Sequence, residues 1–347
     1  MTSDVEITAV REAHRFDEAA LARYLAANLD GFDGGLEVGQ FEGGQSNPTF
    51  HLKNNGRRYV LRKKPPGDLL PSAHQVDREY RVMTALAETG VPVPRTHILC
   101  QDDSVIGTAF YVMEMVEGRV LIDPLLPSFS ADERRALYDH FIEVLAKLHG
   151  VDYEAVGLGD FGRAGNYYTR QIGRWTKQYV ASQTEDIPEM EALMEWLPAN
   201  IPDSDQTTIV HGDYRIGNCV IHPTEPRIVA VLDWELSTLG HPMADVAYCC
   251  MGYHSATGTG DSFRGQDLAA MGLPSEQQFL DRYCAKAGRD GIDNWNFYLV
   301  FSLFRSAAIV QGVYKRGLDG NASSDRSSQF EGFCRARAQW AWALVDR

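Results

Sequence analysis

The feature that most constrains the fold of this chain is a change of hydrophobic periodicity near residue 117. Over residues 36–116 most segments alternate apolar and polar residues, which is the pattern of half-buried strands. An Asn-Asn-Gly sequence at 54–56 is typical of a tight hairpin turn, and one helix is predicted at 76–90. Helical spacing then dominates. The change predicts two lobes, a small strand-rich one at 1–117 and a larger, mainly helical one at 118–347.

Local signals predict elements on both sides of this boundary. A further pair of strands is expected within 102–116. Ser130 and Glu133 have the spacing of a capping box at the start of a long helix. A short strand pair, at 219–222 and 228–232, interrupts the helical part. Together these elements predict an α+β fold.

Charge and composition argue against several classes of partner. The formal net charge is −14, and no Lys- or Arg-rich stretch is long enough to reverse it locally. Neither nucleic acid nor an anionic membrane surface is therefore an expected partner. The six cysteines include no Cys-x-x-Cys pair and are expected to be reduced. The longest apolar run, at 297–304, is shorter than the ~20 residues of a membrane span, and no secretory signal is recognised, so a cytoplasmic location is expected.

Two polar stretches stand where a core would place Val or Leu. "HGDYRIGN" at 211–218 contains Asp213 and Asn218, and "VLDWE" at 231–235 places Asp233 at the end of a predicted strand. Phosphoryl transfer needs one carboxylate to orient and deprotonate a hydroxyl, and oxygen ligands to hold Mg²⁺ against nucleotide phosphates. An aspartate, an asparagine and a second aspartate supply these groups. The alternative is an ordinary polar turn, which would not predict Asp233 at that place.

The same residues carry a resemblance that covers nearly the whole chain. His211-Gly212-Asp213 with Asn218, followed by Leu232-Asp233-Trp234, resembles the aminoglycoside phosphotransferase and choline kinase family, relatives of the protein kinases. "EGGQSNPTF", "YVLRKKPPG", "REYRVMTAL" and "HPMADVAY" are similar to the subgroup found alone in bacteria and fused to some acyl-CoA dehydrogenases. The resemblance implies a bilobal protein-kinase-like fold, with a small N-terminal antiparallel sheet plus one helix and a larger, mainly helical C-terminal lobe.

The resemblance also implies roles for individual residues. Asp213 is expected to be the catalytic base, and His211 is expected to brace the catalytic loop. Asn218 and Asp233 are the expected magnesium ligands. Arg215 lies where protein kinases keep a lysine on the transferring phosphate. ATP and Mg²⁺ are the implied cofactors.

A cation for the α and β phosphates is expected from the N-terminal lobe. Arg62 in "YVLRKK" stands at the position of the strand lysine of kinases, and Glu79 follows on the predicted helix to pair with it. A guanidinium fork matches the oxygens of carboxylates and phosphates. Strand alternation turns Lys63 to the opposite face. The alternative for both Arg62 and Glu79 is an exposed surface charge.

Two further segments are expected to contact the nucleotide. The loop at 42–50 lies between strand-like runs, as a phosphate-covering loop would, and its expected phosphate-binding residues are Gly43, Gly44, Gln45 and Ser46. A plain hairpin turn is the alternative. The strand end near 116 resembles a kinase hinge, where Met113 would lie behind the adenine and Glu114 and Val116 would bond to it through their backbones.

Asp245 follows Asp233 by twelve residues, and this gap bears on the acceptor. The family keeps an aspartate at the place of Asp245 that ties the catalytic loop down; the alternative is a carboxylate at a helix N-terminus. The gap is too short for the segment on which protein kinases lay a peptide. A small-molecule hydroxyl acceptor is therefore expected, bound by a monomer or homodimer.

The sequence leaves the acceptor open. Family members phosphorylate aminoglycosides, choline-like amines, macrolides, homoserine and, in the dehydrogenase-fused branch, hydroxyacyl thioesters. The C-terminal helical part is aromatic and basic rather than densely acidic, which favours a neutral or anionic acceptor such as a hydroxyacyl group or hydroxyacyl-CoA. A true aminoglycoside kinase stays open, as does a nucleotide-binding pseudokinase acting as a scaffold. A nicotinamide oxidoreductase is disfavoured because "GGQSNP" opens no helix and no βαβ unit follows.

Overall fold

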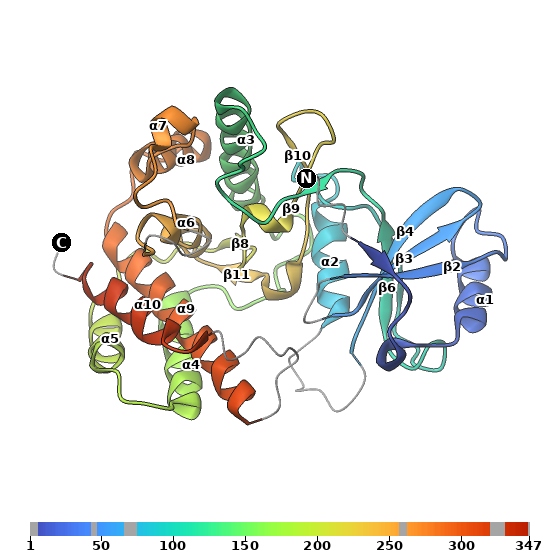
Figure 1. Cartoon of the computed structure of the whole chain (residues 1–347), viewed down its shortest axis with the longest axis horizontal. Helices are drawn as coiled ribbons and strands as arrows, with labels where there is room; N and C mark the ends of the chain where they lie inside the picture. The colour runs from blue at the N-terminus through green and yellow to red at the C-terminus, as the bar shows by residue number, and fades with distance from the viewer. Residues whose placement is uncertain (1–5, 43–46, 66–74, 257–261, 320–329, 346–347) are drawn as a thin grey trace. The chain divides into compact units, whose positions relative to one another are not determined.

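The contacts of the chain divide it into two compact units. The computed structural model describes residues 6–42, 47–65, 75–256, 262–319 and 330–345 (Figure 1). The first unit combines 1–122 with 154–158 and 216–237, and the second combines 123–153, 159–215 and 238–347. A single boundary at 117/118 does not anticipate the return of 216–237 to the first unit. That boundary stays a prediction for the domains.

A six-stranded antiparallel sheet forms the centre of the first unit. Its order is β1-β2-β3-β4-β6-β5, from the strands β1 (Ile7–Thr8), β2 (Glu37–Phe41), β3 (Thr49–Asn54), β4 (Arg57–Lys63), β5 (Thr96–Cys100) and β6 (Phe110–Glu114). The turn between β3 and β4 places Asn55 and Gly56 at φ of 47° and 80°. Asparagine and glycine tolerate this left-handed conformation best, which confirms the hairpin predicted from the Asn-Asn-Gly sequence.

Helices lie on opposite sides of this sheet. α1 (Glu18–Asn28) packs Leu21 and Leu25 into a core with Phe50 and other apolar residues of one sheet face. α2 (Val76–Leu86) packs against β5 and β6 from the other side (Figure 1). The helix predicted at 76–90 is therefore confirmed, although it ends at Leu86.

The strand pair predicted within 102–116 is wrong for its first strand. The partner of β6 is β5, which lies before that range. Residues 102–107 form turns instead, because the Asp102 side chain accepts from Ser104 N and the Asp103 carbonyl accepts from Gly107 N. Ile106, which suggested a strand, packs into the core as part of this connection. The side-chain bond of Asp102 and the backbone bond of Asp103 thus favour a turn over the strand that the apolar residues suggested.

A smaller sheet of the first unit carries two predicted site residues at one end. Its order is β10-β9-β7, from β7 (Arg119–Val120), β9 (Cys219–Ile221) and β10 (Ile228–Val231). The hairpin of β9 and β10 confirms the predicted strand pair. Leu232 N donates to Asn218 O at 2.8 Å, so Asn218 and the start of the turn after β10 are neighbours. The short 3-10 helix η3 (Trp234–Leu236) follows.

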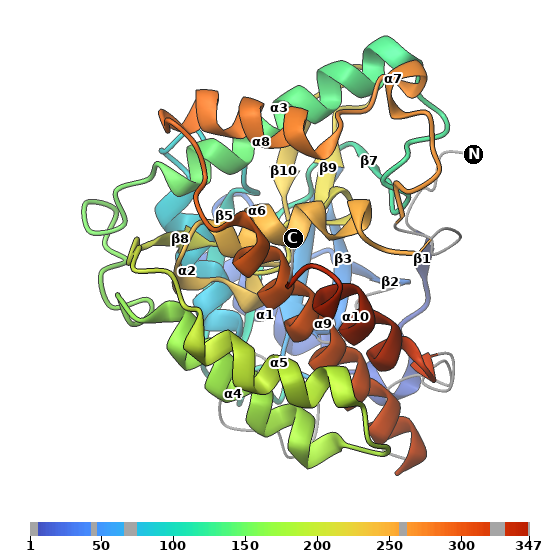
Figure 2. The same ribbon diagram turned by 90° about the vertical axis from the view of Figure 1, so that its left-hand side faces the viewer.

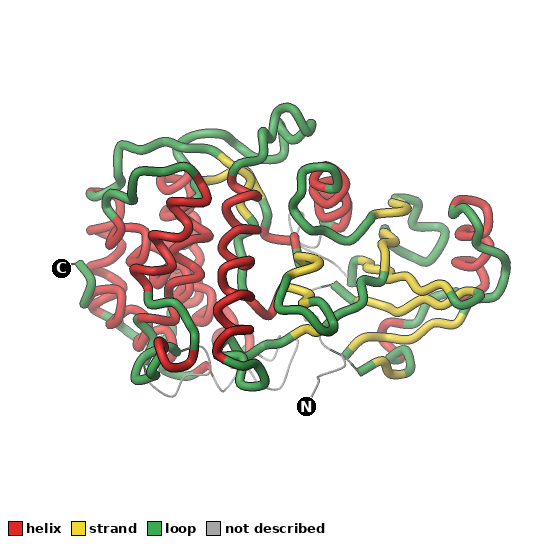
Figure 3. The backbone as a smooth tube through the Cα atoms, turned by 90° about the horizontal axis from the view of Figure 1, so that it is seen from above, coloured by secondary structure: helices red, strands yellow, loops and turns green. Residues whose placement is uncertain are grey.

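The second unit is mainly helical. Its helices are α3 (Ala131–His149), α4 (Tyr167–Ser182), α5 (Pro188–Ala199), α6 (Met243–Cys250), α7 (Leu268–Met271), α8 (Glu276–Ala287), α9 (Trp295–Leu318) and α10 (Phe333–Trp342). Figure 2 shows α4, α5, α9 and α10 packed together, and Figure 3 shows how helices dominate this unit and strands the other. β8 (Thr208–Val210) pairs with β11 (Thr238–Gly240). Ser130 and Glu133 form the predicted capping box of α3. The predicted α+β fold is confirmed.

The helix α9 is the one described helix long and apolar enough to cross a membrane by length and composition alone. Its apolar window has a mean hydropathy of 1.3, and 78% of that window is buried inside the protein. A helix at the centre of a packed helical unit has the same properties, so they are weak support for a membrane span. The helix extends well beyond the apolar run at 297–304 seen in the sequence.

Candidate active site

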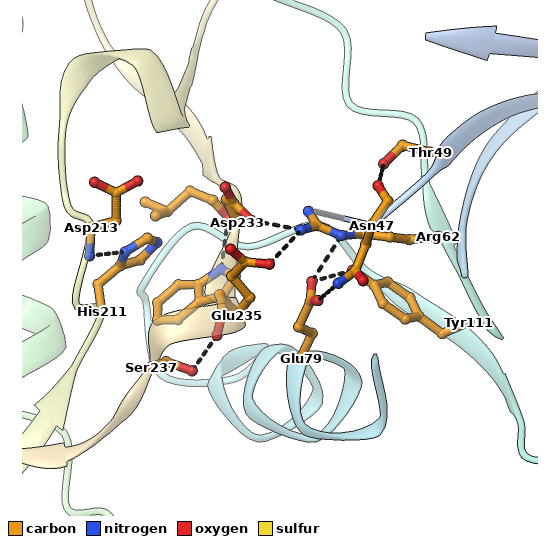
Figure 4. A network of polar contacts seen from close by, with 12 residues as sticks. Asn47, Thr49, Arg62, Glu79, Tyr111, His211, Asp213, Asp233, Glu235 and Ser237 are labelled. Carbon is orange, nitrogen blue, oxygen red and sulfur yellow. Dashed lines mark hydrogen bonds and ion pairs between the residues drawn. The ribbon is translucent and has the colours of Figure 1, made fainter. Parts of the chain in front are cut away.

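Arg62 of β4 is held among three carboxylates of the first unit. Its Nε lies 3.2 Å from Glu79 Oε2 on α2, and its Nη2 lies 2.6 Å from Asp233 Oδ1 after β10. Glu235 Oε2 is 3.7 Å from the same Nη2 (Figure 4). Arg62 therefore joins Glu79, the partner that the sequence predicts, to Asp233, the residue predicted to bind metal. Lys63 turns to the other face, as predicted, where its Nζ lies 5.8 Å from the centre of the Phe16 ring.

Glu79 is fixed on both of its oxygens by neutral donors as well. Asn47 Nδ2 donates to Oε1 at 2.7 Å, and the Tyr111 hydroxyl donates to Oε2 at 3.0 Å (Figure 4). Asn47, Glu79 and Tyr111 are each 1% exposed. A buried carboxylate with this many partners has one defined geometry, and it holds the guanidinium of Arg62 in place.

One guanidinium cannot neutralise three carboxylates, and the pKa values of Glu79 and Arg62 reflect that excess. Burial, together with the Asp233 and Glu235 carboxylates, raises the pKa of Glu79 to about 7, against the lowering effects of Arg62 and Tyr111. Burial alone would lower the pKa of Arg62, but the Glu79 and Asp233 carboxylates raise it above its ordinary value. The cluster therefore favours an additional positive charge beside Asp233.

A Glu79→Gln variant should reveal this titration in the stability of the fold. Because the pKa of Glu79 rises from 4.5 to about 7 on folding, its contribution to stability is complete below pH 4.5 and is lost as the pH rises towards 7. Glutamine does not titrate. We expect the unfolding free energy of the wild type, relative to the variant, to fall by about 3 kcal/mol or less between pH 4.5 and pH 8. Urea unfolding at several pH values measures this, and parallel pH profiles for the two proteins would contradict it.

Asn218 and Asp233 have the donor chemistry and the backbone placement of a magnesium site. Asn218 directly precedes β9 and Asp233 follows β10, its antiparallel partner. Their side chains offer an amide and a carboxylate oxygen, which are ligands of hard cations. Asp233 adopts a left-handed conformation, φ 64° and ψ 59°, which is uncommon outside glycine and occurs often at functional sites. Among the described residues no group of three or more His, Cys, Asp or Glu side chains could hold a metal by itself. Two protein ligands suit an ion completed by phosphates and water.

The loop that carries Asp213 lies in the second unit and is tied down by Asp245 of α6. Asp245 Oδ2 accepts from His211 N at 2.7 Å, and Oδ1 accepts from Gly212 N at 2.8 Å. His149 Nε2 lies 3.3 Å from the same carboxylate. Burial would raise the pKa of Asp245, but His149 and the His211 N–H hold it below its ordinary value. Asp245 thus has the loop-supporting contacts that the resemblance implies.

The Asp213 carboxylate itself is partly exposed, and Tyr248 and Arg215 of the second unit lie beside it. The Tyr248 hydroxyl of α6 donates to Oδ1, and Arg215 Nε lies 3.5 Å from Oδ2. Burial, followed by the Asp213 charge, raises the pKa of Tyr248 above its ordinary value, so the phenol stays a proton donor. Asp213 N donates to His211 Nδ1 at 3.2 Å (Figure 4). This contact lies at the residue expected to act as base, and the bracing role of His211 stays a prediction.

The remaining predicted residues are placed less fully. Gly43, Gly44, Gln45 and Ser46 lie outside the described residues. Met113 and Glu114 end β6, where Met113 is buried and pairs with Val60, and Val116 follows the strand. The chain crosses from one unit to the other between Arg215 and Ile216, so Asp213 and Asn218 belong to different units although they are five residues apart.

Several residues of these two groups are not predicted from the sequence. Glu235, Asn47 and Tyr111 join the Arg62 cluster, and Tyr248 and His149 join the Asp213 loop. Tyr248 ends the "HPMADVAY" stretch, and helical spacing from Asp245 was a usable signal for it, because residues three apart share a helix face.

A model of the phosphotransferase enzyme family matches residues 37–283 of this chain, including every described residue of both groups. The chain belongs to the phosphotransferase enzyme family. This phosphotransferase is also 47% identical, over 341 residues, to acyl-CoA dehydrogenase family member 10 of Mus musculus. That match covers 97% of this chain and 32% of the mouse protein, so the chain spans about a third of that relative's length.

Solved structures agree with the family. A Ralstonia eutropha JMP134 protein, provisionally named an aminoglycoside phosphotransferase, is 51% identical with a TM-score of 0.89, covering 96% of this chain and 99% of that one. A thermostable mutant of the aminoglycoside phosphotransferase APH(4)-Ia, in a ternary complex with AMP-PNP and hygromycin B, is 18% identical with a TM-score of 0.58, covering 92% and 98%. The family resemblance and the kinase-like fold predicted from the sequence are confirmed. Family and fold together support phosphoryl transfer to a small molecule.

Proposed function

We propose that this phosphotransferase moves the γ-phosphoryl group of ATP to a hydroxyl of a small molecule in a magnesium-dependent reaction. The observation that carries the proposal is the double ion pair of Arg62, to Glu79 at 3.2 Å and to Asp233 at 2.6 Å. Arg62, the cation that we propose for the α and β phosphates, thus lies beside Asp233, a proposed metal ligand. The AMP-PNP bound to the APH(4)-Ia neighbour supports a nucleoside triphosphate donor.

The residues of the first unit would bind and neutralise the triphosphate. Bound Mg²⁺ supplies positive charge against the phosphate oxygens, and Asn218 and Asp233 are the residues that would hold it. The Arg62 guanidinium would donate to phosphate oxygens, while Glu79 holds it in place through Nε. The excess negative charge of the Arg62 cluster favours a divalent cation at this place.

Asp213 is the proposed base for the acceptor hydroxyl. Asp245 and His211 hold the loop backbone, so the carboxylate is positioned before the acceptor binds. Tyr248 donates to one of its oxygens and Arg215 lies 3.5 Å from the other, and this carboxylate would accept the proton of the acceptor hydroxyl. Arg215 is 48% exposed on its side chain and is the candidate to contact the transferring phosphate.

We propose a neutral or anionic hydroxylated acceptor, either a hydroxyacyl group or its CoA thioester. The name of the mouse relative, an acyl-CoA dehydrogenase family member, supports an acyl context. The provisional name of the Ralstonia protein favours a second candidate, an aminoglycoside acceptor. These two acceptors differ in charge, so one experiment separates them.

The test is a product-detected kinase screen with ATP and Mg²⁺ against hydroxy acids, their CoA thioesters, choline and aminoglycosides. We expect a phosphorylated hydroxyacyl product whose formation stops with EDTA and resumes with Mg²⁺. Faster turnover of an aminoglycoside than of every hydroxyacyl compound would overturn the acceptor proposal. Nucleotide binding without any phosphorylated product across the panel would instead favour the pseudokinase.

A further inference from the structure

The peptide that joins Gly212 to Asp213 is held at both of its polar ends by side chains. Its N–H, on Asp213, donates to His211 Nδ1 at 3.2 Å. Its carbonyl oxygen, on Gly212, accepts from Arg305 Nη2 at 2.8 Å. The preceding N–H, on Gly212, is held by Asp245 at 2.8 Å. The orientation of the Asp213 backbone therefore depends on a residue 92 positions further along the chain.

Gly212 needs an external donor at this place. Its φ of 84° lies in the left-handed region, where the chain reverses direction and cannot extend the ladder of β8 into the loop. Its carbonyl oxygen is bonded instead by a side chain of α9, whose own backbone N–H groups are committed within the helix. An arginine is long enough to reach from a helix and is always charged, so its hydrogen bond to a carbonyl is stronger than a neutral one.

Arg305 has few other partners that would explain its burial. The residue is 8% exposed, its Nε is buried without a hydrogen-bond partner, and its guanidinium carbon lies 5.6 Å from the centre of the Trp175 ring. No carboxylate of the described residues lies within 4.0 Å of its nitrogens. A buried guanidinium without a carboxylate is costly to retain, and a surface role is excluded by its burial. Within the part of the chain that the structure describes, the hydrogen bond of this guanidinium goes to the Gly212 carbonyl.

We propose that Arg305 is a positioning residue for the reaction: from α9 it fixes the Gly212–Asp213 peptide and thereby aims the Asp213 carboxylate. Asp245 holds the N-terminal side of the loop turn, and Arg305 holds its C-terminal side, next to the base. The proposal rests on the proposed role of Asp213 for its effect on rate. Its structural part, the ordering of the loop, does not depend on that role.

The experiment compares Arg305→Met with Arg134→Met. Arg134 is a matched control, because it also belongs to the second unit and donates to backbone carbonyls, from Nε to Leu126 O at 3.0 Å and from Nη1 to Met271 O at 3.2 Å. Arg305→Lys keeps a charged donor and tests for rescue. Hydrogen–deuterium exchange of peptides covering 207–216, thermal melting, and kcat and KM for ATP with an acceptor found by screening are measured for all four proteins.

We expect Arg305→Met to lower kcat by about 10- to 100-fold with KM for ATP within about twofold, as for a small misplacement of a catalytic group. Amides of the 207–216 segment should exchange about tenfold faster in this variant, and Arg305→Lys should recover part of both effects. Arg134→Met should lower the melting temperature but change neither kcat nor the exchange of the 207–216 amides. Equal exchange in the two methionine variants would overturn the proposal even if no acceptor is found. If the wild type shows no turnover but Arg305→Met still exchanges faster, the role of Arg305 in ordering the loop is sustained. The proposed function is then rejected instead.

Discussion

Replacement of Asp213 by asparagine is expected to lower turnover by about 10²- to 10⁴-fold and to leave the affinity for ATP within about twofold. The amide cannot accept the proton of the acceptor hydroxyl at neutral pH. It has the same shape as the carboxylate, and its oxygen can still accept from the Tyr248 hydroxyl. The nucleotide affinity should persist because Arg62, Glu79, Asn218 and Asp233 all belong to the other unit.

Steady-state turnover with the acceptor found by screening, and titration calorimetry with a non-hydrolysable ATP analogue and Mg²⁺, measure the two quantities. Asp139→Asn is the matched control, because Asp139 is an exposed carboxylate of the same unit that pairs with Lys286 at 3.2 Å. It should keep wild-type turnover. Full activity of Asp213→Asn would remove Asp213 as the base, and loss of nucleotide affinity in that variant would indicate a disrupted fold.

Local sequence patterns predicted those parts of the fold and site that neighbouring residues determine. The Asn-Asn-Gly turn needs only the left-handed tolerance of Asn55 and Gly56, and the capping box of α3 needs only Ser130 and Glu133. The pairing of Arg62 with Glu79 was predictable because β4 and α2 are close in sequence and the family resemblance supplies the register. The metal and catalytic roles stay predictions, since they require bound species.

Contacts between distant segments could not be predicted in the same way. Arg305 lies in an apolar helix, and no local feature distinguishes it from an arginine that reaches the surface. Only the folded chain brings its Nη2 to Gly212 O. Asparagine is likewise common in exposed turns, yet Asn47 is buried and donates to Glu79. The strand wrongly predicted near 102–107 has a related cause. Val105 and Ile106 are apolar because they pack against the core from a turn, and not because they belong to a strand. Burial of a polar residue is a property of the tertiary fold.

Arg62→Met is expected to destabilise the first unit and weaken ATP binding together, which distinguishes it from Asp213→Asn. The Arg62 side chain is 12% exposed and that of Glu79 is 1% exposed, and removal of the guanidinium leaves the buried Glu79 carboxylate without its cation. Breaking such a pair costs about 3–5 kcal/mol, and KM for ATP should rise roughly tenfold or more if Arg62 binds phosphate.

Arg58→Met on the same strand is the control for this prediction. Arg58 pairs with Glu117, but the two side chains are 43% and 71% exposed, so the loss of this pair should cost no more than about 1 kcal/mol and leave KM unchanged. Urea unfolding and ATP kinetics of both variants provide the comparison. Because the raised pKa of Glu79 lets it take up a proton near neutral pH, the defect of Arg62→Met should be smaller at pH 5.5 than at pH 8. A defect in unfolding free energy that is independent of pH would show that packing of the arginine stem, and not its charge, stabilises this part of the fold.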